Sequence, residues 1–193
     1  MDSQNYTCLK KNNYSFENYQ LIPIRFEDAE IIRKWRNEQI IFLRQEKSIS
    51  RNEQVQYFEQ IVIPTFKKSS PELILFSFLE NSQIVGYGGF VNVDWDKKIT
   101  EISFLIKTDR TTNSTLYETD FSVFLKFLKK IACDELNFNE LFTETYDIRP
   151  THIRILEKNG FKIFKREKYG KIIDGNSVDI LFHSYTCNKG ENT

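Results

Sequence analysis

The stretch that decides the fold is Leu73–Ile106, LILFSFLENSQIVGYGGFVNVDWDKKITEISFLI. Turns at Asn81-Ser82 and Asp96–Lys98 divide it into three strands. The first strand is almost continuously apolar, as expected of a strand that is buried on both faces. Turns this short predict that the three strands are antiparallel neighbours. The expected strands span residues 73–79, 84–95 and 99–106.

Helices are expected before this segment. A short strand over residues 19–25 contains Pro23, and a helix that ends near Asn37 follows it. A second helix starts at Ser50, because Ser50 and Glu53 form an S-x-x-E capping box in which each residue satisfies a free N–H of the other.

After residue 106 the pattern changes to alternating helices and strands. Apolar residues at helical spacing predict a long amphipathic helix over residues 121–132. Pro150 suits the first turn of a further helix, and Gly160 suits its C-terminal end. Further strands are expected over residues 141–146, 161–165 and 178–185.

This order predicts one α/β (α+β) domain, built on a single mixed β-sheet of about six to seven strands with about four flanking helices. The expected domain spans residues 19–186. A polar N-terminal extension (1–18) precedes it, and a C-terminal tail (187–193) follows it.

Composition and charge exclude several classes of protein. The 193 residues are 40% hydrophobic and 28% charged, which indicates a folded chain. The 27 Lys and Arg residues balance 27 Asp and Glu residues, so the basic excess of a nucleic-acid-binding protein is absent. No apolar run approaches the ~20 residues of a membrane span. The first residues are polar, so we expect no secretory signal.

The three cysteines, Cys8, Cys133 and Cys187, are widely spaced. They form neither a CxxC pair nor a disulfide framework. We therefore expect reduced thiols, no metal site and a cytoplasmic location.

Four motifs in this order of elements resemble the GNAT N-acetyltransferase superfamily. Trp35-Arg36-Asn37, IVGYGGF (84–90), EISFLI (101–106) and ILEKNGF (155–161) are similar to its WRN, iiGyggf, aEigfll and vLEklGF segments. The WRN signature is typical of the branch that holds ribosomal-protein N-terminal and nucleotide-amino-sugar N-acetyltransferases. The resemblance covers about residues 19–185 and implies a sheet that is splayed at its centre.

The resemblance also implies direct attack of a substrate amine on acetyl-CoA, without a metal. In the family, the backbone of splayed parallel strands holds the pantetheine arm, and free N–H groups at a helix N-terminus hold the pyrophosphate. Arg149 takes the place of a CoA-contacting asparagine, where it binds a phosphate or only covers the helix N-terminus. The implied cofactor-binding residues are Phe104, Leu105, Ile106, Arg110, Thr111, Thr112, Asn113, Ser114, Thr115 and Arg149.

The pyrophosphate loop departs from the family pattern Q/R-x-x-G-x-G/A. Arg110 matches, but Asn113 and Thr115 replace the two small residues. Asparagine is the best substitute for glycine where φ must be positive, so we expect Asn113 to preserve the loop. Thr115 and Glu118 form a capping box that competes with a phosphate for N–H donors. Glu118 and Asp120 in the first turn would repel an anion, or they only complement the helix dipole.

Three residues are candidates for catalysis. The resemblance implies that Glu101 orients the water that deprotonates the amine; the alternative is a structural carboxylate that is solvated or paired with Lys98. The family's tyrosine in the last helix, the acid for the departing thiolate, is replaced by Leu156. Tyr146 and His152 are the substitutes, and each is alternatively a buried structural side chain.

The candidate acceptor-binding residues are Trp35, Arg36, Asn37, Tyr87 and Glu144. The alternative is a core position for Trp35 and a surface position for Arg36.

Two functions follow from these features. The first is N-acetyl transfer from acetyl-CoA to a small-molecule amine, preferably that of a nucleotide-linked sugar, with a protein N-terminal amine and an aminoglycoside as the next acceptors. The second is a non-catalytic binding module of the same fold that has lost acyl-CoA affinity. We expect a monomer or homodimer with no nucleic-acid or membrane partner.

Overall fold

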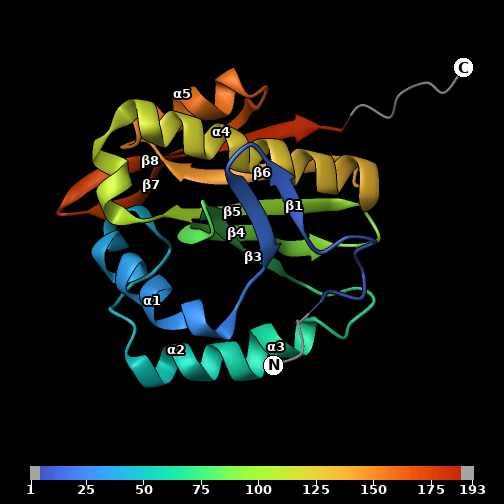
Figure 1. The fold of residues 1–193 in the computed structure, drawn as a ribbon. Coiled ribbons are helices and arrows are strands. Elements are labelled where there is room, and N and C mark those ends of the chain that lie inside the picture. Colours follow the sequence, from blue (N-terminus) through green and yellow to red (C-terminus); the bar gives the residue numbers. More distant parts are fainter. Residues whose placement is uncertain (1–4, 188–193) are drawn as a thin grey trace, which may run out of the picture.

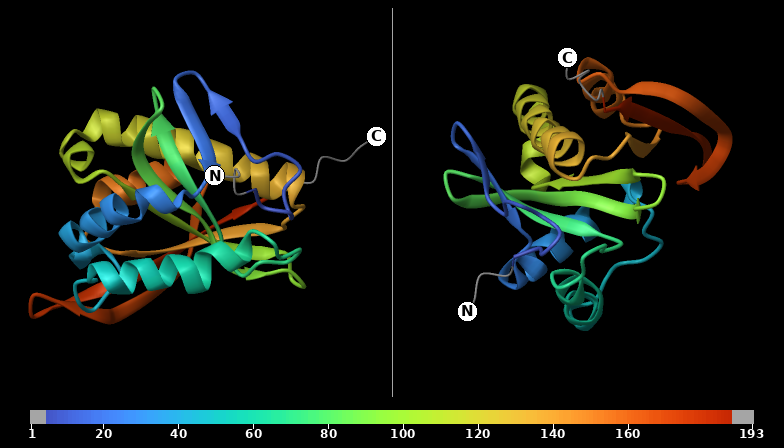
Figure 2. Two further views of the ribbon diagram at one scale, coloured as in Figure 1. Left: turned by 60° about the horizontal axis from the view of Figure 1, so that its bottom comes forward. Right: turned by 90° about the vertical axis from the view of Figure 1, so that its right-hand side faces the viewer.

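The computed structural model describes residues 5–187 as one mixed, eight-stranded β-sheet with helices on both faces (Figure 1). The strand order is β1-β2-β3-β4-β5-β6-β8-β7. Helices α1 to α3 cover one face, and α4 and α5 cover the other (Figure 2). The strands are β1 (Tyr14–Phe16), β2 (Tyr19–Pro23), β3 (Ile74–Glu80), β4 (Gln83–Asp94), β5 (Ile99–Ile106), β6 (Glu140–Tyr146), β7 (Lys162–Ile173) and β8 (Asn176–Thr186). The helices are α1 (Ala29–Glu38), α2 (Arg51–Tyr57), α3 (Ile63–Thr65), α4 (Ser114–Lys130) and α5 (Pro150–Lys158).

The three-strand segment forms the centre of the sheet, as the sequence predicts. β3, β4 and β5 are consecutive antiparallel neighbours. Gly89 lets β3 and β4 approach, because a Cβ atom at this position would lie 2.1 Å from the carbonyl oxygen of Ile74. The capping box of Ser50 and Glu53 also forms as predicted at the start of α2.

The sheet opens between β5 and β6. These parallel strands are paired only where Ile99–Glu101 lies beside Glu140–Phe142, and beyond this point they separate. β6 remains paired with β8 as far as Tyr146. Because α4 follows β5 and α5 follows β6, both helices start at the open end of this gap.

Aromatic side chains fix α4 on the sheet beside the gap. Phe121 and Phe124 are fully buried, and the Phe121 ring stacks on Phe104 of β5 with 4.5 Å between the ring centroids. Burial of each such side chain contributes about 2 kcal/mol. α5 ends at Lys158, and Gly160 follows the C-cap residue Asn159 with a φ of +88°, which favours glycine, as predicted for the end of this helix.

The segment before residue 19, expected to be a polar extension, packs into the fold. Tyr6 is 1% exposed, and its hydroxyl donates to the carbonyl oxygen of Leu75 at 3.0 Å. β1 lies in the same segment and adds an eighth strand to the sheet. β7 and β8 extend further than expected. Residues 1–4 and 188–193, which include most of the expected C-terminal tail, lie outside the described residues.

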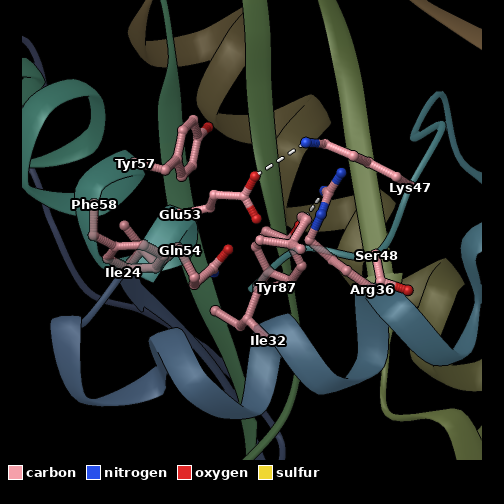
Figure 3. A pocket seen from close by; sticks show the side chains of 11 residues that line it. Ile24, Ile32, Arg36, Lys47, Ser48, Glu53, Gln54, Tyr57, Phe58 and Tyr87 are labelled. Carbon is pink, nitrogen blue, oxygen red and sulfur yellow. Dashed lines mark hydrogen bonds and ion pairs between the residues drawn. The ribbon is translucent and has the colours of Figure 1, made fainter. Parts of the chain in front are cut away.

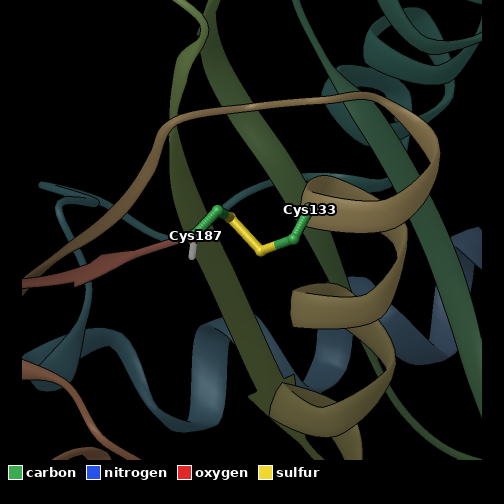
Figure 4. The surroundings of a disulfide bond; sticks show 2 residues. All are labelled: Cys133 and Cys187. Atoms are coloured by element: carbon green, nitrogen blue, oxygen red, sulfur yellow. A yellow bond between two sulfur atoms is a disulfide. The ribbon is translucent and has the colours of Figure 1, made fainter. Parts of the chain in front are cut away.

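The prediction of reduced thiols is wrong for two of the three cysteines. Cys133 and Cys187 form a disulfide that joins the helical turn after α4 to the end of β8 (Figure 4). The two residues are separated by 54 positions in the sequence, so their spacing carried no signal of this contact. Cys8 is free.

Within residues 5–187, the chain has no helix of the length and apolar character needed to span a membrane. The same residues contain no group of three or more His, Cys, Asp or Glu side chains that could hold a metal ion.

Candidate functional site

A narrow cavity occupies the gap between β5 and β6. Its volume is about 90 Å³, the space of roughly three water molecules in the liquid. Glu101 and Phe104 point to opposite faces of β5, and both line the cavity, so it passes through the sheet. The gap brings together six residues that the sequence predicts for the site: Glu101, Phe104, Glu144, Tyr146, Arg149 and His152.

Glu101 lies where the two strands separate, and it is only 3% exposed. One carboxylate oxygen accepts a hydrogen bond from Arg44, and the other accepts from Asn92 Nδ2 at 2.7 Å. Arg44 also donates to Glu144 at 3.0 Å. The partner of Glu101 is therefore Arg44 rather than Lys98 or solvent. A carboxylate accepts about four hydrogen bonds, so Glu101 retains capacity for a water molecule.

Tyr146 lies at the end of β6, on the same cavity as Glu101. Burial and the neighbouring Glu144 carboxylate raise the pKa of Tyr146. The phenol therefore keeps its proton at neutral pH and can donate it or a hydrogen bond.

A buried hydrogen-bonded chain connects the N-terminal turns of α4 and α5. Arg149 Nη2 donates to the Tyr117 hydroxyl at 2.9 Å, and this hydroxyl lies 2.7 Å from His152 Nδ1. Burial lowers the pKa of His152 well below its ordinary value, and the Arg149 charge acts in the same direction. The imidazole is therefore neutral, and its Nδ1 shares a hydrogen bond with the Tyr117 hydroxyl. This arrangement fixes the position of Arg149 at the edge of the cavity.

The expected left-handed conformation at Asn113 is wrong. Asn113 has a φ of −100°, and its Oδ1 caps α4 by accepting from the Leu116 N–H at 3.0 Å. The expected capping box of Thr115 and Glu118 is wrong for the same reason: α4 begins at Ser114, so Thr115 already lies inside the helix. Four exposed residues surround this cap: Thr111, Thr112, Ser114 and Thr115.

The charges expected to act on an anion near this helix are neutralised. Arg110 pairs with Asp120 at 2.7 Å and with Glu80 at 3.0 Å, and Asp120 is fully buried. Glu118 pairs with Arg154 at 2.9 Å. Neither Asp120 nor Glu118 is a free negative charge, and the guanidinium of Arg110 already has two carboxylate partners. The predicted contact of Arg110 with a cofactor stays a prediction.

A second cavity of about 330 Å³ lies between α1, α2 and β4 (Figure 3). Arg36 and Tyr87 line it, and Arg36 Nη1 donates to the Tyr87 hydroxyl at 2.7 Å. Asn37 supports its wall, because the Asn37 amide donates to and accepts from the backbone of Ile49 at 2.9 and 2.8 Å.

The remaining predicted residues belong to the core. Trp35 is 4% exposed and packs among apolar side chains, which is the alternative considered for it above. Leu105 and Ile106 are likewise buried in β5, beyond the point where the gap opens. Their predicted backbone contacts with a cofactor stay predictions.

Two polar residues that line the first cavity, Arg44 and Thr143, were not found from the sequence. Two others, Asn92 and Tyr117, form hydrogen bonds with its lining residues and were also missed. Arg44 lies in a loop with no motif. Asn92 carried a weak signal, since it is a polar residue in the strand next to Glu101. The Thr143 hydroxyl is buried and has no hydrogen-bond partner among the described residues. A polar ligand in the gap would supply that partner.

The model of the acetyltransferase (GNAT) domain family matches residues 22–181. No curated protein sequence matches the chain.

Solved structures share the fold at low sequence identity. Spermidine N-acetyltransferase from Vibrio cholerae, in complex with CoA and spermine, aligns with a TM-score of 0.77 and 12% identity over 89% of this chain and 97% of that chain. A dodecameric structure of the enzyme in an intermediate state gives a TM-score of 0.76 and 13% identity over 92% and 98%. Ribosomal-protein-S5-alanine acetyltransferase from Vibrio fischeri gives a TM-score of 0.71 and 14% identity over 93% of this chain and 98% of that chain.

Proposed function

The chain belongs to the GNAT acetyltransferase family, and from this premise we propose that it is an N-acetyltransferase that moves an acetyl group from acetyl-CoA to a primary amine by direct attack. The observation that carries this proposal is the cavity in the gap between β5 and β6. Donors and acceptors reach it from both faces of the sheet: the carboxylate of Glu101 and the hydroxyl of Tyr146 from one face, and the hydroxyl of Thr143 from the other.

The residues around the gap fit the polar arm and the phosphates of CoA. Arg149 lies between the starts of α4 and α5, and it has no carboxylate partner among the described residues. A guanidinium in this place can bind a phosphate oxygen with two parallel N–H bonds. The unpartnered hydroxyl of Thr143 is available to an amide of the pantetheine arm. Arg149, rather than Arg110, is therefore the cation that we assign to the cofactor.

Arg44 marks the place of the acceptor amine. Its guanidinium is half exposed and binds both Glu101 and Glu144 across the mouth of the cavity. An acceptor amine enters as an ammonium ion and is attracted by the same two carboxylates. When the ammonium ion replaces Arg44, Glu101 can accept a proton from it through a water molecule. The neutral amine can then attack the thioester. Tyr146 then supplies a proton or a hydrogen bond to the departing thiolate.

We place the acceptor among small-molecule amines, with the amino group of a nucleotide-linked sugar as the first choice. The Trp35-Arg36-Asn37 segment supports this choice through its resemblance to that branch of the family. A protein N-terminal amine and an aminoglycoside are the alternatives.

Calorimetric titration with acetyl-CoA tests the proposal, followed by thiol release with a panel of amines. We expect saturable binding that Arg149→Gln weakens by at least about tenfold, because a hydrogen bond to a charged group is lost. Arg154→Gln is the matched control, since Arg154 lies on the same helix but pairs with Glu118. If the folded protein gives no binding heat at millimolar acetyl-CoA, the proposed acetyltransferase activity is refuted.

A non-catalytic module is the second candidate. The small volume of the cavity, the neutralised Arg110 and the Asn113 cap on α4 favour it. It predicts a folded protein that binds neither acetyl-CoA nor CoA.

A further inference from the structure

Two arginines of the described chain have no carboxylate within 4.0 Å, and they are Arg36 and Arg149. Each donates instead to a tyrosine hydroxyl, and each lines a different cavity. The other arginines each pair with at least one carboxylate: Arg25, Arg33, Arg44, Arg51, Arg110, Arg154 and Arg166. The cavity of Arg149 is accounted for by the proposed cofactor, whereas the cavity of Arg36, which contains two of the residues that the sequence predicts for the acceptor, has no counter-charge assigned to its guanidinium.

The cavity of Arg36 has the size of a small-molecule site. At about 330 Å³, it lies at the lower end of the ~300–1,000 Å³ that ligand sites occupy. Ile32 and Phe58 form an apolar floor, and Tyr57 forms a side wall (Figure 3).

The charges in this cavity do not balance. Lys47 and Glu53 pair with each other at 3.3 Å at its exposed edge (Figure 3). Glu53 also accepts from the Ser50 N–H, so its carboxylate is held by the start of α2. This pair leaves the half-buried guanidinium of Arg36, whose partners Gln45 and Tyr87 are both neutral. A partly buried charge without a counter-charge is costly, and a ligand anion removes that cost.

We propose that the cavity between α1 and α2 binds a small organic anion, a carboxylate or phosphate on an apolar body, with Arg36 as its counter-charge. The planar guanidinium matches either anion through paired N–H bonds. Tyr57 and Phe58 offer aromatic surface to the body of the ligand. The binding itself does not depend on acetyl transfer.

Calorimetry with phenylacetate, phenyl phosphate and the neutral phenylacetamide tests the proposal. We expect the two anions to bind at millimolar concentration and the amide to bind far more weakly. Arg36→Gln should lower the affinity for both anions by at least about tenfold. Ser48→Glu places a negative charge at the cavity from an exposed loop position and should also lower the affinity for the anions. The neutral variant Ser48→Gln should leave that affinity unchanged. This second pair of variants keeps the test valid if Arg36→Gln fails to fold.

The proposal is overturned if no probe anion binds the folded protein, if phenylacetamide binds as well as phenylacetate, or if Ser48→Glu and Ser48→Gln bind the anions equally. A parallel titration with CoA reports on the other cavity, so the two sites can fail independently.

Acetyl-CoA turnover then separates two sources of the anion. An anion that carries a primary amine and becomes acetylated is an acceptor held in this cavity. One that binds and is not consumed is a second ligand beside the acceptor. Either result supports an anion site.

Discussion

Reduction of the Cys133–Cys187 disulfide is the perturbation whose effect follows most directly from the structure. The bond closes a segment of 54 residues that contains β6, α5, β7 and β8. This segment supplies one whole side of the gap, including Glu144, Tyr146 and Arg149. Its C-terminal end is also held by a hydrogen bond from the Cys187 N–H to the Asn139 carbonyl at 2.9 Å.

The size of the effect can be derived from the length of the closed loop. For a separation of 54 residues, the chain-entropy model gives about 4 kcal/mol at 25 °C. A domain of this size has a free energy of unfolding of about 5–15 kcal/mol, so the bond would supply a large share of it. In this model the bond acts by restricting the unfolded chain, so we expect the folded contacts of β6 and β8 to survive reduction.

Urea unfolding with and without a reductant measures this difference. We expect reduction to lower the free energy of unfolding by about 4 kcal/mol. The variant Cys133→Ala/Cys187→Ala is the control, and it should be insensitive to reductant because the remaining Cys8 is free. Equal stability of the oxidised and reduced wild type would refute the reasoning. A cytoplasmic location stays a proposal, and in a reducing compartment the protein would have to remain folded without this contribution.

Three further predictions concern single side chains. Glu101→Gln should lower turnover with acetyl-CoA by about 10²–10⁴-fold and leave acetyl-CoA affinity nearly unchanged; unchanged turnover in steady-state assays would remove Glu101 from the mechanism. Asp120→Asn should lower the free energy of unfolding by about 3 kcal/mol in urea, because it breaks the buried pair with Arg110, whereas Glu118→Gln on the same helix should cost under about 1 kcal/mol; similar losses for both would contradict this account. His152 is neutral in the folded protein because burial lowers its pKa, but it can bind a proton in the unfolded chain below its ordinary pKa of 6.5. Stability should therefore fall as the pH falls below 6.5 and be independent of this group above it. His152→Phe should reduce that slope by up to about 1.4 kcal/mol per pH unit, and an identical slope in the variant would show that His152 does not titrate on unfolding.

The sequence predicted the sheet well where periodicity and turns are local. The apolar run of β3 and the short turns on either side of β4 define their antiparallel order without further information. The start of α2 was equally clear, because Ser50 and Glu53 satisfy each other within one turn. These features depend on residues that are close in the chain.

Features that depend on distant residues were missed. Asn113 was missed for a local reason instead: asparagine tolerates a positive φ, but here its side chain forms a hydrogen bond as the cap of α4. Arg110 was expected to meet a phosphate, yet the long-range pair with Glu80 and the pair with Asp120 already neutralise it. Cys133 follows α4 and Cys187 follows β8, so their contact depends on the packing of elements that are distant in the sequence.

The two arginines without a carboxylate partner lie on opposite sides of the proposed reaction centre. Arg149 approaches the gap from the side of α4 and α5, whereas Arg36 belongs to α1 and lines the cavity on the other face. Glu101 stands where the sheet opens and is reached by Arg44 from the loop after α1. Arg36 in turn binds Gln45, the residue next to Arg44 in the chain. Gln45 and Tyr87 use two of the five N–H donors of Arg36, so three remain for an anion. Under the proposed function, a cofactor enters from one face and an acceptor from the other, and the gap between β5 and β6 is where their reacting atoms meet.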